Sequence, residues 1–141
     1  MTELRLEPIR GWRLWRVRRD GVGYRLASWC RGEDWPERER LEARCRRFVG
    51  RSHGRAPEPG HACGIYAVRT RELAESLLRS MPATRAGTIA IGTVSLWGRV
   101  IENVGGWRAQ FAYPYELFVP GAGRDVVSDL TRRYAVDASA A

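Results

Sequence analysis

The chain has 141 residues, with 24 basic and 16 acidic side chains and a formal net charge of +8. This length suits one domain that buries a core without disulfides. No apolar run approaches the roughly 18 residues of a membrane span, and the first residues lack the apolar stretch of a secretion signal. We therefore expect a cytoplasmic protein with no membrane partner, in which three cysteines serve as metal ligands or buried thiols.

Every basic residue is an arginine. Arginine suits the recognition of phosphates and base edges because its planar fork donates two hydrogen bonds at once. A GC-rich genome would produce the same bias without any functional demand. Residues 1–55 hold 15 arginines against 8 acids, whereas residues 56–141 hold 9 against 8. The positive charge thus belongs to the N-terminal part of the chain.

The first expected element is a β-hairpin that mixes arginine and tryptophan on both faces. Residues 8–17 and 23–29 are strand-like, and Asp20-Gly21 suits a tight turn. A helix over residues 36–49 should follow, because Asp34 can cap it and Glu37 lies three residues after that cap.

The second half of the chain alternates strand and helix signals. Residues 51–62 are a loop, residues 64–68 a strand, and Thr70 caps a helix with Leu73, Leu77, Leu78 and Met81 at its core positions. Residues 88–102 and 107–113 form a second hairpin, and residues 115–119 form a last strand. A C-terminal helix follows, with Val126, Val127, Leu130 and Tyr134 at helical spacing.

These elements predict an α+β fold with a curved antiparallel sheet, or a small PUA-like β-barrel, with two or three helices and a zinc-stapled loop. We expect one zinc-stabilised domain over residues 1–136 and a frayed tail over residues 137–141.

Four residues stand at metal-ligand spacing in the loop region. Cys45, His53, His61 and Cys63 follow the pattern C-x7-H-x7-H-x-C and include both histidines of the chain. Zinc binds thiolate sulfur and imidazole nitrogen in a tetrahedral shell, and four protein ligands leave no position for water. The pattern predicts a structural zinc ion. Alternatively, the two thiols are buried residues and the histidines are solvated, and Cys30 is a spare thiol that can replace a histidine.

The arginine-rich part predicts a nucleic-acid surface. Arginines can neutralise phosphates, and Trp15, like Trp12 or Trp35, can stack on unpaired bases. The alternative is a solvated basic face over core tryptophans. The residues expected on this surface are Arg13, Trp15, Arg16, Arg18, Arg19, Arg46, Arg47, Arg51 and Arg55.

Enzyme motifs are missing from the sequence. It contains no phosphate-binding loop with lysine, no H-E-x-x-H and no G-x-S-x-G. The enzymatic alternatives are a Cys63 nucleophile with His61 as base, or a catalytic zinc with Glu58 as base. Trp97, Trp107 and Arg108 flank the second hairpin as a candidate pocket, although aromatic pairs also stabilise sheets.

Two resemblances rest on strings of the second half. The strings H-A-C-G-I-Y-A (residues 61–67), W-G-R-V-I-E (97–102) and G-W-R-A (106–109) resemble small uncharacterised proteins of GC-rich bacteria. The order of strand 64–68, helix 71–81 and strand 88–96 is similar to the middle of PUA-like and ASCH-like β-barrels, over about half of the chain. That resemblance implies binding of RNA or of modified nucleic acid.

The sequence thus favours a non-enzymatic nucleic-acid-binding or regulatory module with a structural zinc site. The runner-up is an adaptor whose basic face binds an acidic protein, and the third hypothesis is a small zinc or thiol hydrolase. Nothing in the sequence distinguishes DNA from RNA as the partner.

Overall fold

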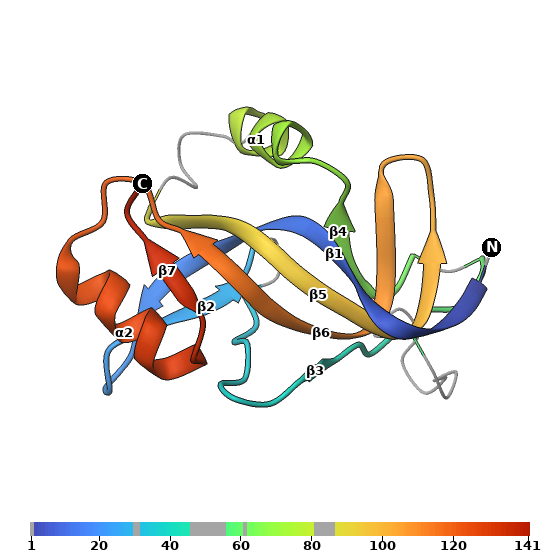
Figure 1. The fold of residues 1–141 in the computed structure, drawn as a ribbon, viewed down its shortest axis with the longest axis horizontal. Coiled ribbons are helices and arrows are strands. Elements are labelled where there is room, and N and C mark those ends of the chain that lie inside the picture. Colours follow the sequence, from blue (N-terminus) through green and yellow to red (C-terminus); the bar gives the residue numbers. More distant parts are fainter. Residues whose placement is uncertain (1, 30–31, 46–55, 61, 81–86) are drawn as a thin grey trace.

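The computed structural model describes residues 2–29, 32–45, 56–60, 62–80 and 87–141. Within these ranges the fold is α+β, with a mixed sheet of seven strands and two helices (Figure 1). This confirms the predicted class and the curved sheet. The elements are β1 (Thr2–Arg19), β2 (Tyr24–Ser28), β3 (Leu41–Glu42), β4 (Ile65–Val68), α1 (Arg71–Arg79), β5 (Ile89–Glu102), β6 (Gly106–Phe118), α2 (Arg124–Tyr134) and β7 (Asp137–Ser139).

Three long antiparallel strands, β1, β5 and β6, form the frame of the sheet (Figure 1). β1 also pairs with β2 from Trp15↔Ser28 to Arg19↔Tyr24, across a turn in which the Asp20 carboxylate accepts the amides of Val22 and Gly23. Both predicted hairpins are therefore confirmed. The expected strands 107–113 and 115–119 are one continuous strand, β6, with an irregularity in its pairing near Pro114.

The sheet curls so far that strand β4, at the end of the series of paired strands, meets β1, where the series begins. β5 joins β1 to β6, β6 pairs with β4, and β4 meets β1 again at Trp12↔Val68. Glycine permits this closure, because a Cβ on Gly11 would lie 2.6 Å from the Cβ of Ala67. Backbones that approach this closely leave no room for a side chain.

One edge of β6 carries three short segments in succession. β4 pairs with residues 106–109, β3 with 111–112 and β7 with 116–118. Residues 137–139, expected to fray, instead form β7 parallel to β6, where Val119 also donates to the carbonyl of Ser139. The backbone groups of the β6 edge provide the partners that hold this tail.

The expected helix over residues 36–49 is wrong for its described part, residues 36–45. Arg38 has a φ of 61°, which a right-handed helix excludes, and Leu41 and Glu42 pair with β6. The capping pattern around Asp34 is used differently, because that carboxylate binds Arg18 and Arg25. Ion pairs and sheet pairing with distant residues thus override the local helix signal.

The two helices bury very different amounts of apolar surface. α2 packs on the main core through Val126, Leu130 and Tyr134, as its spacing predicts. α1 begins at Thr70 as predicted, yet it buries only Ala74, and its leucines Leu73, Leu77 and Leu78 are 42%, 51% and 37% exposed. The expected core role of these leucines is therefore wrong. Neither helix is long and apolar enough to cross a membrane, within the residues the structure describes.

The contrast between the helices predicts different costs for the same substitution. Leu130→Ala should lower the free energy of unfolding by about 2–5 kcal/mol, because it opens a cavity in the core. The matched control Leu77→Ala should change it by about 0.5 kcal/mol or less, since that side chain is half exposed. Urea unfolding followed by circular dichroism measures both values. Equal costs for the two variants would contradict this description of α1.

Candidate functional site

The two thiols of the predicted zinc site lie at the base of one excursion from the sheet. Ala43 donates its amide to the carbonyl of Gln110, and Ile65 pairs with the next residue of β6, Ala109. The chain therefore leaves the β6 edge after Ala43 and rejoins it one position further along. Cys45 follows Ala43 by two residues, and Cys63 precedes Ile65 by two residues. Sheet pairing therefore fixes the two ends of the excursion, and one cysteine lies near each end.

The described part of this excursion is packed against the sheet. Ala56 and Pro57 are buried, and the Glu58 carboxylate pairs with Arg99 of β5 at 3.1 Å. Arg108 of β6 donates to the carbonyl of Cys63 at 2.7 Å. Glu58 and the Cys63 carbonyl are thus each tied to a neighbouring strand by an arginine.

The structure places two of the four expected zinc ligands. Cys45 and Cys63 are half-buried and line one common cleft. His53, His61 and the spare thiol Cys30 lie outside the described residues. Among those described, no three His, Cys, Asp or Glu side chains gather as a metal-binding group. The zinc site therefore stays a prediction.

The cleft shared by the two thiols has a volume of about 1010 Å³. β1 and β4 contribute Trp12, Arg13 and Tyr66, α1 contributes Leu77, and the segment 33–45 forms much of the remaining lining. Tyr66 is 45% exposed because the residues of β4 alternate between the core and the surface. That alternation in the string I-Y-A-V is the sequence signal that marks Tyr66 as an outward residue.

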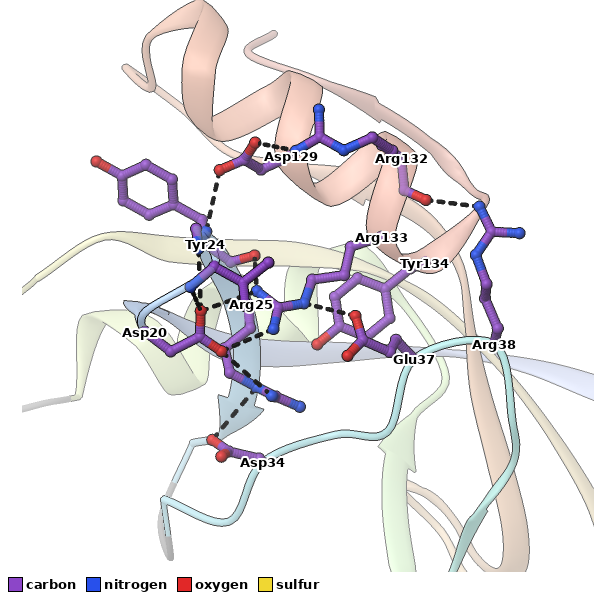
Figure 2. Close-up of polar contacts among 12 residues, drawn as sticks. Asp20, Tyr24, Arg25, Asp34, Glu37, Arg38, Asp129, Arg132, Arg133 and Tyr134 are labelled. Carbon is purple, nitrogen blue, oxygen red and sulfur yellow. Dashed lines mark hydrogen bonds and ion pairs between the residues drawn. The ribbon is translucent and has the colours of Figure 1, made fainter.

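Arginine side chains hold the segment 33–45 in place (Figure 2). Arg18 forms a fork with Asp34, with nitrogen–oxygen distances of 2.7 and 2.9 Å. Each partner shifts the other: the Asp34 carboxylate raises the pKa of Arg18, and the hydrogen bond from Arg18 lowers the pKa of Asp34. Arg25 donates to the carbonyl of Trp35 at 2.8 Å, so two arginines of the hairpin bind consecutive residues of the segment.

Arg133 of α2 is the most enclosed of these arginines, with a side chain 8% exposed. Its guanidinium binds Asp20 of the hairpin turn at 2.7 Å and Glu37 at 2.6 Å, and it donates to the carbonyl of Tyr24 (Figure 2). These hydrogen bonds raise its pKa, and they hold the pKa of Asp20 far below its usual range. One side chain thus joins α2, the first hairpin and the cleft wall.

The predicted nucleic-acid-binding arginines that lie on β1 mostly have hydrogen-bond partners elsewhere in the fold. Arg13 donates to the carbonyl of Tyr66 at 2.7 Å, and Arg16 donates to the carbonyl of Trp29 at 3.3 Å. Arg18 binds Asp34, as described above, whereas Arg19 is exposed with its guanidinium 5.7 Å from the Tyr24 ring. Three of these four residues are therefore engaged in the fold.

The expected base-stacking role of Trp15 is incompatible with its position. Trp15 is fully buried and meets Trp35 edge-on, with ring centroids 5.5 Å apart. An indole enclosed by the core has no free face for a base. Arg46, Arg47, Arg51 and Arg55 lie outside the described residues, so their role stays a prediction.

Two exposed arginines that the sequence did not single out line the cleft. Arg40 lies over the Phe111 ring at 3.9 Å, and Arg44 precedes Cys45. Their placement follows from β3, a strand of two residues that has no recognisable sequence signal.

The candidate pocket of Trp97, Trp107 and Arg108 is divided among three environments. Trp97 packs against Phe111 and lines a second cleft, Trp107 lies under Arg69 at 4.7 Å, and Arg108 binds the Cys63 carbonyl. Neither of the two clefts described contains all three residues.

Comparison of the chain with protein-family models, curated proteins and solved structures found no match.

The low pKa of Asp20 predicts a pH-dependent contribution to stability. Because the folded pKa lies below the ordinary value of 3.8, this contribution is present above about pH 4 and is lost as pH falls toward the folded value. Asp20→Asn should therefore destabilise the protein at pH 7, and the difference from the unmutated protein should shrink below pH 4. Urea unfolding at several pH values measures this. Glu7→Gln, on an exposed carboxylate of β1, is the control, and a difference that grows in acid would contradict the argument.

Proposed function

We propose that the chain is a zinc-stabilised, non-enzymatic nucleic-acid-binding module that receives an unpaired base in the cleft beside Cys45 and Cys63. The observation that carries the proposal is that both thiols line the same cleft as Tyr66 and the exposed Arg40 and Arg44. Two thiols, an aromatic ring and cationic side chains thus converge on one region of the surface.

The zinc part of the proposal is supported by the geometry of the excursion. The chain leaves and rejoins adjacent positions of β6, and a thiol lies just outside each point. Both histidines of the chain belong to the segment between them. Zinc bound by Cys45, His53, His61 and Cys63 would close this loop and add its binding energy to folding. Four protein ligands leave no site for a metal-bound water, which is why we propose no hydrolytic activity.

The charges in the cleft favour a base over a phosphate track. Glu39 and Glu42 line it together with Arg40 and Arg44, so the lining is not uniformly basic. A polyphosphate backbone along its length would meet these carboxylates. A single base can instead stack on Tyr66 while the exposed arginines bind the flanking phosphates.

The zinc hypothesis predicts a stoichiometry and a folding effect. Protein purified without chelator should contain about one zinc per chain, and both Cys45→Ser and Cys63→Ser should lower this content and the thermal unfolding midpoint. Elemental analysis and calorimetry measure the two quantities. Cys30→Ser is the matched control and should retain the metal. Metal-free protein that is fully folded would refute the zinc site.

The nucleic-acid hypothesis predicts separate effects for ring and charge. Tyr66→Ala should weaken binding of single-stranded oligonucleotides by about 1–3 kcal/mol, because it removes the stacking platform. Arg40→Gln combined with Arg44→Gln should reduce the slope of log K against log salt by about 0.7 per lost contact. Fluorescence polarisation with single-stranded and duplex DNA and RNA measures both effects.

Arg124→Gln, on an exposed arginine at the start of α2, is the matched control and should bind as the unmutated protein does. If the unmutated protein binds no DNA or RNA at low salt, the nucleic-acid proposal is wrong. The basic surface then points to an acidic protein partner.

A further inference from the structure

A second cleft, of about 770 Å³, lies beside the C-terminal end of α2 and is rich in aromatic and proline residues. Trp97 of β5 and Tyr113 and Tyr115 of β6 line it, together with Pro8 and Pro114. It contains none of the residues of the first cleft.

The pairing of β5 with β6 exposes one ring of this cleft. Val94 pairs with Pro114 and Thr93 pairs with Glu116, so Tyr115 is an extra residue on β6. Such a bulge redirects a side chain out of the regular alternation. Tyr115 is accordingly 49% exposed, and the guanidinium of Arg10 lies 3.3 Å from its ring centroid.

The other two rings are held in place by their neighbours. The Tyr113 hydroxyl donates to the carbonyl of Tyr134 at 2.7 Å and accepts the amide of Arg38 at 2.8 Å. Trp97 packs against Phe111 with ring centroids 6.1 Å apart. Trp97 is half-buried on the lining of the cleft. The aromatic lining therefore needs little reorganisation to bind.

The lining of this cleft carries an exposed carboxylate although the protein is basic, and the cation beside it is Arg10, over the Tyr115 ring. Asp137 is exposed on the lining, and β7 places it beside Glu116 of β6. Like charges on neighbouring strands are unfavourable without a counter-charge. The carbonyls at the C-terminal end of α2 accept from Arg38 and from the Tyr113 hydroxyl, so they add little to this charge. Arg132 and Arg133, in the last turn of α2, are already paired with other carboxylates.

We propose that the second cleft binds a proline-rich peptide segment that carries a basic residue. Prolines in an extended polyproline helix pack between aromatic rings, and a tryptophan N–H can donate to the carbonyls that such a helix leaves unpaired. The basic side chain meets Asp137 and Glu116 at the rim. The same carboxylates repel phosphate, which separates this site from the proposed nucleic-acid cleft.

The test is an array of labelled ten-residue peptides with the spacing P-x-x-P and one arginine at each flanking position in turn. Saturable binding of at least one peptide is expected. Replacing its prolines by alanine should weaken the best binder about tenfold, and replacing its arginine by glutamate should abolish binding. Fluorescence polarisation measures these affinities.

Variants of the protein locate the site. Trp97→Ala should weaken binding about tenfold, as expected for an aromatic anchor at an interface. Asp137→Asn, on an exposed residue, should weaken binding severalfold and reduce its salt dependence. Tyr66→Ala, in the first cleft, should leave peptide binding unchanged.

Thermal unfolding of each variant separates lost binding from lost folding. If Trp97→Ala is unfolded, the affinity of Asp137→Asn alone shows whether the peptide binds in the second cleft. The proposal is overturned if no peptide of the array binds, if proline replacement has no effect, or if Asp137→Asn binds as well as the unmutated protein. Displacement of the peptide by an oligonucleotide would equally overturn it, because the two clefts share no lining residue.

Discussion

The edge of β6 that does not pair with β5 is the constraint on which the rest of the structure depends. The N–H and C=O groups along that edge need partners, and three segments from distant parts of the sequence supply them in turn. β4 and β3 bring Cys63 and Cys45 to the base of one excursion, and β7 brings Asp137 to the second cleft. Both proposed sites are therefore products of backbone pairing along a single strand.

Arginine acts in this protein largely as a structural side chain. Its guanidinium groups donate to backbone carbonyls, pair with carboxylates and lie over aromatic rings, often doing two of these at once. A lysine ammonium is a point charge that cannot reproduce a planar fork. Arg13 illustrates the point, because it binds a carbonyl of β4 and also lies 4.9 Å from the Trp35 ring. A high arginine content therefore does not by itself mark a phosphate-binding face.

The sequence predicted the features that depend on near neighbours. Both hairpins, the Thr70 cap and the buried face of α2 follow from turn chemistry and periodicity, and the structure confirms them. The sequence could not predict the path of residues 36–45, because contacts with distant partners such as Arg133 and β6 determine that path. The leucines of α1 have core-like spacing, but whether another element covers a helix face is a property of topology. The first cleft is lined by residues from distant parts of the chain, which only the fold brings together.

Tyr113 has a part in both clefts. Its ring lines the second cleft, while its hydroxyl holds the amide of Arg38 in the segment that forms the wall of the first. That hydroxyl also satisfies a carbonyl at the end of α2, and burial raises its pKa, so it stays protonated as a donor. Phenylalanine would keep the ring and release the segment. The two clefts share no lining residue, yet a single oxygen atom joins the framework of one to the framework of the other.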